Sequence, residues 1–158
     1  MDIGTVMSNL RSLESGLSIT TPYSLATKRA YLYIPDKQTD MPDNDPFGWF
    51  NGYTLVREER KPSGLQRQFY AIDIQGLARD PSLDKASQIA TSFLTAIVAA
   101  LDLHQKLAVI DPATPACTYC ELRGKTPTLS RLTWANQAYI GLDLILDVEL
   151  QTTNPVGV

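Results

Sequence analysis

The strongest pattern of hydrophobic and polar positions lies near the end of the chain, in Ala138 to Leu150 (AYIGLDLILDVEL). Every even-numbered position there is apolar, and most odd-numbered positions are polar or small, with Tyr139 and Ile145 as exceptions. Side chains of a strand point alternately to its two faces, so this period of two predicts one strand with one buried face. Such a strand would extend about 43 Å, whereas strands of about five or six residues are usual. We therefore expect part of it to extend past its own domain and meet something else.

Two segments have the three- and four-residue spacing of an amphipathic helix. Residues 2–17 form the first, which is short and must dock on another element to be stable. The second extends from about Pro81 to Lys106, with Asp80 expected as its N-cap and Pro81 as its first helical residue. We expect this second helix to cover the even-numbered face of the 138–150 strand. In the first helix the residues with this spacing are Ile3, Val6, Met7, Leu10 and Leu13. In the second helix the stripe consists of Leu83, Ala86, Ile89, Ala90, Phe93, Leu94, Ile97, Leu101 and His104.

The remaining segments predict further strands and their connections. Residues 52–59 and 65–78 are expected to form a hairpin around the turn 61–64, and the polar start of its second strand, Gln66-Arg67-Gln68, is expected to protrude. Three further strands are predicted at 29–34, 117–123 and 129–134, and the segments 18–28 and 107–116 are expected to be connections without regular structure.

Residues 35–48 are rich in proline and aspartate and almost free of apolar side chains. This composition argues against regular structure, so we expect a mobile loop. Phe47, Trp49 and Phe50 stand at its end. This aromatic cluster fits a buried anchor, or alternatively a contact patch for a neighbouring subunit.

Strands joined by hairpins indicate the fold class. We expect an α+β fold with a mainly antiparallel sheet, an N-terminal helix and one long covering helix. A chain of 158 residues fits a single domain, residues 1–158, with a flexible C-terminal tail from about residue 152.

Composition and charge argue against several classes of protein. A net charge of −3 provides no bulk attraction to nucleic acid. The longest apolar run, Phe93 to Leu101, is far shorter than the ~20 residues that span a bilayer. No apolar segment follows Asp2 as a secretory signal would require. Two cysteines form no disulfide framework, and a reducing cytoplasm is the simplest compartment.

Cys117-Thr118-Tyr119-Cys120 is a C-x-x-C, the one recognised chemical motif in the sequence. A zinc site needs four ligands, and the only other Cys or His in the chain is His104. A redox pair of the thioredoxin type stands at the start of a helix. Here a strand is predicted, in which the two thiols would point to opposite faces. We therefore expect two ordinary thiols and no cofactor.

Other candidate groups do not form a catalytic constellation. His104 is near the end of a helix, where its cationic form would complement the helix dipole, and no acid or nucleophile can be placed beside it. Asp143, Asp147 and Glu149 line one face of the long strand, either as a solvated face or as ligands of a divalent cation. The basic residues in 57–61 alternate with acidic ones, so they form no nucleic-acid patch. No phosphate-binding loop or nucleophile elbow is present, and we expect no enzyme.

The run QFYAIDIQGLARDPSLDKASQIATSFLTAI, a strand that passes through a short turn into a covering helix, is followed by the long strand YIGLDLILDVELQ. This arrangement resembles the tail terminator (tail completion) proteins of long-tailed bacteriophages. The similarity covers roughly residues 2–150 and is one of architecture without an invariant signature, and residues 35–48 have no match in the family. The resemblance implies a structural virion protein that forms a hexameric ring. Such a ring caps the tail tube and joins it to the head, in a virion assembled in the host cytoplasm.

The partners implied by this resemblance are further copies of the chain, the tail tube protein and a head–tail connector protein. DNA would pass through the channel without specific binding, and no membrane is involved. A ring requires two different contact patches per subunit, which we expect at the hairpin 57–68 and the far end of strand 138–150. Acidic side chains facing the channel would repel DNA phosphates. The predicted interface residues are Trp49, Phe50, Arg57, Arg60, Gln66 and Arg67, and the predicted lumen-facing residues are Asp143, Asp147 and Glu149.

Three alternatives stay open at this point. Other head–tail connector (neck) subunits share the general fold of the terminators. A redox or metal-binding domain would use Cys117 and Cys120. A small ligand-binding domain would use Trp49 and Phe50 to line its pocket.

Overall fold

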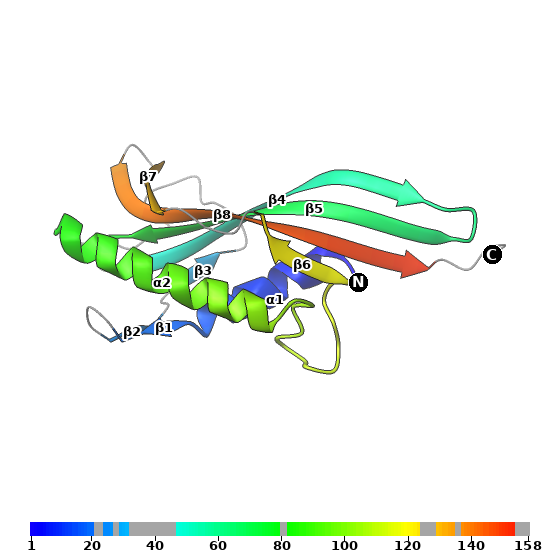
Figure 1. Cartoon of the computed structure of the whole chain (residues 1–158), viewed down its shortest axis with the longest axis horizontal. Coiled ribbons are helices and arrows are strands. Elements are labelled where there is room, and N and C mark those ends of the chain that lie inside the picture. Colours follow the sequence, from blue (N-terminus) through cyan, green and yellow to red (C-terminus); the bar gives the residue numbers. More distant parts are fainter. Residues whose placement is uncertain are drawn as a thin grey trace.

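The computed structural model describes residues 1–20, 24–26, 29–31, 47–79, 82–123, 129–134 and 137–153. Its elements follow one another as helix, three short strands, a long hairpin, a second helix and three further strands (Figure 1). Their bounds are α1 Ile3–Ser15, β1 Ser18–Ile19, β2 Leu25–Ala26, β3 Arg29–Tyr31, β4 Phe47–Arg60, β5 Leu65–Ala78, α2 Leu83–Leu103, β6 Tyr119–Leu122, β7 Leu129–Trp134 and β8 Gln137–Thr153.

The main sheet has six strands in the order β3-β4-β5-β8-β6, with β7 also paired to β8. All of its pairings are antiparallel except that of β3 with β4, which is parallel. The predicted α+β fold with a mainly antiparallel sheet is therefore confirmed. The segment 18–28 was expected to be a simple connection, but it contains β1 and β2, which pair with each other.

The predicted long strand is confirmed as β8 and is longer than expected. It pairs with β5 from Leu65↔Thr153 to Ala78↔Ile140. The residues of its even-numbered face that point into the core are Leu142, Leu144, Leu146, Val148 and Leu150, all at most 4% exposed. Strand pairing continues through Thr153, so the prediction of a flexible tail is wrong for residues 152 and 153, and residues 154–158 lie outside the described residues.

Both helices lie on the same side of the main sheet, which we call the helix face; the opposite side is the outer face (Figure 1). Helix α1 begins after Asp2, whose side chain accepts a hydrogen bond from the Thr5 N–H at 2.9 Å, and it ends at Gly16. Its buried residues Val6, Met7, Leu10 and Leu13, together with one stripe of α2, form a single core with β8. The even-numbered face of β8 is therefore covered by α2, as predicted, and α1 belongs to the same core.

Helix α2 begins two residues later than the sequence suggests, at Leu83 instead of Pro81. Its N-cap is Ser82, whose hydroxyl accepts a hydrogen bond from the Lys85 N–H at 3.5 Å, so the prediction of Asp80 as the cap and Pro81 as first helical residue is wrong. The helix ends at Leu103 rather than at Lys106. Leu83, predicted for the apolar stripe, is 62% exposed because it lies in the first turn, ahead of the part that meets the sheet.

Helix α2 is long and apolar enough to cross a membrane by length and composition. Its residues Ala86, Ile89, Ala90, Phe93, Ile97 and Leu101 are nevertheless buried in the core of this domain. We therefore describe it as the core helix of an α+β domain.

The aromatic cluster at the start of β4 packs α2 against the sheet. The rings of Phe47 and Phe93 stack at a centroid distance of 4.0 Å, and Trp49 meets both rings edge-on. Gly76 on β5 lies against this cluster, since an added Cβ there would be 2.6 Å from Phe47 Cζ. Residues 47 and 48, which the sequence assigned to the mobile loop, are thus strand residues; residues 35–46 lie outside the described part.

The hairpin of β4 and β5 confirms the predicted turn at 61–64. Gly64 has a φ of 83°, which favours glycine, and its N–H donates to the Lys61 carbonyl at 3.0 Å. A β-bulge at Val56 shifts the register, so that Leu55 pairs with Tyr70 but Arg57 with Phe69. The hairpin and the C-terminal end of β8 extend together beyond both helices (Figure 1).

Candidate functional site

The two faces of the sheet differ in how they are covered. On the outer face, Phe50, Leu77 and Tyr139 are buried near the β7 end of the sheet. Toward the hairpin, residues of the same face are exposed, including Ile145 at 37% and Tyr119 at 42%. Among the described residues, the outer face is therefore accessible from the middle of β8 toward the hairpin.

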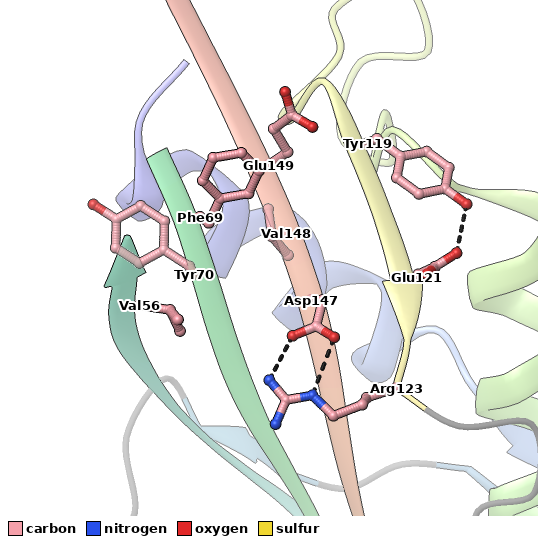
Figure 2. Close-up of a pocket in the computed structure, with 9 residues that line it drawn as sticks. All are labelled: Val56, Phe69, Tyr70, Tyr119, Glu121, Arg123, Asp147, Val148 and Glu149. Carbon is pink, nitrogen blue, oxygen red and sulfur yellow. Dashed lines mark hydrogen bonds and ion pairs between the residues drawn. The ribbon is translucent and has the colours of Figure 1, made fainter. Parts of the chain in front are cut away.

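A pocket of about 240 Å³ lies on this accessible end of the outer face (Figure 2). Alternation along the strands points Phe69 of β5, Glu149 of β8 and Tyr119 of β6 to this side. Val56 reaches the pocket because the bulge releases it from the regular pairing, and it is 62% exposed. The lining residues are Val56, Phe69, Tyr70, Tyr119, Glu121, Arg123, Asp147, Val148 and Glu149.

Phe69 is the aromatic centre of this surface. The guanidinium carbon of Arg57 lies 4.2 Å from the centre of its ring, and that of Arg67 lies 5.2 Å away. Two cations within about 6 Å of one ring are each attracted by the negative charge of its π-face. The bulge at Val56 is what places Arg57 beside Phe69, since it puts these two residues opposite each other.

Ion pairs surround the aromatic centre. Arg67 donates from Nε and from a terminal nitrogen to Glu149 Oε1, at 2.9 and 2.8 Å. Hydrogen bonds from Gln151 and from Arg67 lower the pKa of Glu149, so it is ionised at neutral pH. Arg123 binds Asp147 through two nitrogens, at 2.7 and 3.1 Å (Figure 2). Apolar groups inside a charged rim are typical of protein–protein contact surfaces.

A carboxyl pair lies further along the outer face. Asp73 of β5 is hydrogen-bonded to Asp143 of β8, and its pKa is raised to about 7. Burial is the largest cause, followed by the hydrogen bond and the negative charge of Asp143. Near neutral pH the pair therefore holds a proton for part of the time.

The structure brings together two groups that the sequence treated separately. The predicted interface residues Arg57 and Arg67 lie on the same surface as the predicted lumen residues Asp147 and Glu149. The predicted acidic face is thus partly compensated within the chain, because Arg123 and Arg67 form ion pairs with Asp147 and Glu149, whereas Asp143 is hydrogen-bonded to Asp73. Whether this face lines a channel stays a prediction.

The other two predicted hairpin residues lie on the helix face, around Glu58. Arg60 Nε donates to Glu58 Oε1 at 2.7 Å, and Gln66 is also hydrogen-bonded to this carboxylate. Gln68 donates to its second oxygen at 3.0 Å. Arg60 and Gln66 are thus part of the same hairpin as the pocket but of its opposite side.

Trp49 and Phe50 are corrections to the predicted interface. They are 0% and 1% exposed, Trp49 on the helix face and Phe50 on the outer face. The predicted alternative of a buried anchor is the one that the structure contains. Because both side chains are buried in the core, they do not line a ligand pocket, as the ligand-binding hypothesis required.

The sequence did not single out Val56, Phe69, Tyr119 and Arg123 as site residues. The sequence did contain a signal for Phe69. Tyr70, Ile72 and Ile74 form the buried face of β5, so Phe69 is a large aromatic residue on the opposite, polar face. No local pattern predicted the bulge at Val56 or the pairing of β6 with β8, which bring Tyr119 and Arg123 to the same surface.

The C-x-x-C motif also differs from its prediction. Cys117 precedes β6, so the alternation of a strand does not separate the two thiols, which are hydrogen-bonded to each other. His104 is the C-cap residue of α2, so it lies at the end of the helix and not on the helical stripe where the sequence placed it. Within the residues that the structure describes, no group of three or more His, Cys, Asp or Glu side chains is placed to hold a metal ion.

Comparison with known proteins does not assign this chain to a family. No protein-family model matches this sequence, and a search of curated proteins finds no similar chain.

Proposed function

We propose that this chain is a structural subunit of a ring that terminates the tail tube of a long-tailed bacteriophage and joins it to the head or connector. The proposal rests on the resemblance of its strand–turn–helix segment and long last strand to the tail terminator proteins. It places the protein in the tail or neck of a virion assembled in the host cytoplasm, as a homo-oligomer, with a hexamer as the expected number of copies.

The observation that supports it best is the ribbon of β4, β5 and β8. These strands have 14, 14 and 17 residues, and their shared end projects beyond both helices (Figure 1). A compact solitary domain gains nothing from strands that extend past its core, since exposed paired strands bury little apolar surface. A subunit of a ring can use such an extension to reach the neighbouring copy.

The chemistry of the outer face, at the point where the ribbon leaves the core, is consistent with a contact between proteins. Val56 and Tyr119 expose apolar surface beside Phe69, and ion pairs surround them. A closed ring needs two different surfaces on each subunit, and the outer-face pocket would be one of them. Its ion pairs would exclude mismatched partners and fix the orientation of the correct one.

The test is electron microscopy of tail tubes that lack their terminator, mixed with the purified protein. We expect a ring at one end of each tube and an end to further tube growth. Tubes that stay uncapped and keep growing in excess protein would contradict the proposal. If rings form and bind the head connector but not the tube, the alternative of another neck subunit replaces it.

A further inference from the structure

The Cys117–Cys120 pair is buried and has no part in the surface described above. Its side chains are 0% and 2% exposed. They lie between the end of α2 and β6, where Cys117 Sγ is 3.8 Å from the Gln105 carbonyl oxygen and Cys120 Sγ is 3.8 Å from that of His104. Each thiol is therefore surrounded by protein atoms and not by solvent.

Backbone hydrogen bonds hold the two cysteines in place. The Cys117 N–H donates to the Lys106 carbonyl at 3.2 Å, and the Cys120 N–H donates to the Gln105 carbonyl at 2.8 Å. On the other side, Cys120 pairs with Val148 of β8. Both cysteines are thus held by the same short segment, 104–106, and their thiols are hydrogen-bonded to each other.

The two thiols are not equivalent. The hydrogen bond from Cys120 lowers the pKa of Cys117, and the positive charge of Lys106 acts in the same direction. The same hydrogen bond and burial raise the pKa of Cys120. The thiolate is the nucleophilic form of cysteine, so Cys117 is the sulfur that reacts first with an oxidant.

We propose that Cys117 and Cys120 form a reversible intramolecular disulfide on exposure to a small peroxide, with Cys117 as the attacking thiol and Cys120 as the resolving thiol. The proposal rests on two buried sulfurs that contact each other within one four-residue segment. At 0% and 2% exposure the two cysteines are reached only when the structure opens briefly around them, and hydrogen peroxide, which is neutral and close to water in size, needs a smaller opening than a bulky disulfide reagent.

The reaction balances in two steps. Cys117 thiolate attacks one oxygen of hydrogen peroxide, the O–O bond breaks, and sulfenic acid and hydroxide form. Cys120 then attacks the sulfur of Cys117, which forms the S–S bond. The sulfenic oxygen leaves with the thiol proton of Cys120, and in sum two thiols and one peroxide give one disulfide and two waters.

The experiment treats the folded protein with hydrogen peroxide and measures its intact mass and its migration on a non-reducing gel. We expect a loss of about 2 Da, no covalent dimer, and full reversal by dithiothreitol once the oxidised protein is unfolded in urea. Tryptic peptides should locate the bond within the segment that contains both cysteines. An unchanged mass, an intermolecular dimer, or a disulfide that forms only after unfolding in urea would overturn the proposal.

Two variants test the order of attack. In Cys120→Ala the reaction should stop at Cys117, where dimedone, added as the peroxide-treated protein is unfolded, traps the sulfenic acid, whereas Cys117→Ala should give no adduct at Cys120 in the same time. Equal trapping in both variants, or trapping only in Cys117→Ala, would overturn the assignment of roles. Because the wild-type mass measurement needs no substitution, the disulfide itself is tested even if a variant fails to fold.

Discussion

Glu14 of α1 and Asn51 of β4 are joined by a buried hydrogen bond, in which Asn51 Nδ2 donates to Glu14 Oε2 across 2.8 Å. Both residues are 0% exposed. The bond connects two elements that are 37 residues apart in sequence, and it is the polar contact within the interface between α1 and the sheet.

This contact makes stability depend on pH. Burial raises the pKa of Glu14 from 4.5 to about 8, although the Asn51 hydrogen bond acts in the opposite direction. The folded state therefore keeps a proton that the unfolded state loses. The stabilising contribution is complete below pH 4.5 and is lost as the pH rises through about 8, so the free energy of unfolding should fall by a few kcal/mol over this range.

Urea unfolding at several pH values, compared between wild type and Glu14→Gln, measures this effect. The variant keeps an acceptor for Asn51 but cannot ionise, so its free energy of unfolding should depend less on pH between 5 and 8.5. An equal slope in both proteins would show that Glu14 does not hold the proton.

The Asp73–Asp143 pair gives a second prediction, which concerns the pKa of Asp73 and not the stability of the protein. Asp143→Asn removes the negative charge beside Asp73 but leaves its burial unchanged. The pKa of Asp73 should therefore fall from about 7 and still exceed the ordinary value of 3.8. Carboxyl carbon chemical shifts followed by NMR against pH give this value directly. A pKa of Asp73 that does not move would mean that Asp143 has no share in it.

Gly76 is predicted to tolerate no side chain. A Cβ at this position would lie 2.6 Å from Phe47 Cζ and 3.0 Å from Leu142 Cγ, in the centre of the core. Gly76→Ala should lower the free energy of unfolding by about 1–3 kcal/mol through overpacking.

Gly52, on the neighbouring strand, is the matched control. A Cβ there meets nothing within 4 Å, so Gly52→Ala should change the free energy of unfolding by no more than about 0.5 kcal/mol. Thermal unfolding followed by circular dichroism compares the two variants. Equal destabilisation would contradict the close packing around Gly76.

The proposed contact surface can be tested through Val56. Val56→Asp adds a charge to an exposed residue of the pocket, so it should leave the fold intact and abolish capping of tail tubes, because an uncompensated charge at the centre of an interface is costly. Ile110→Asp is a control of nearly equal exposure, 61% against 62%, in the loop after α2. It should cap tubes like wild type. Loss of capping in both variants, or in neither, would exclude the pocket as the contact.

Several parts of this fold follow from local pattern alone. The alternation in β8, the helical spacing of α1 and α2, and the turn at 61–64 are all visible in the sequence, and the α+β class follows from their order. These predictions succeed because the period of a strand or helix is fixed by residues a few positions apart. The cap of α2 was missed because Asp80-Pro81 and Ser82 offer competing start signals.

The site depended on contacts between distant segments. The cross-strand pair Arg67–Glu149 spans 82 residues, and the bulge at Val56 decides which side of the hairpin Arg57 occupies. The parallel pairing of β3 with β4, the burial of Trp49 and Phe50, and the meeting of the two thiols are likewise results of packing. The sequence by itself determined the two helices, the long strands and which of their faces are apolar, but not the short strands β1 and β2. Only the tertiary structure decided which charges and rings meet, because that depends on the register between strands and not on any one of them.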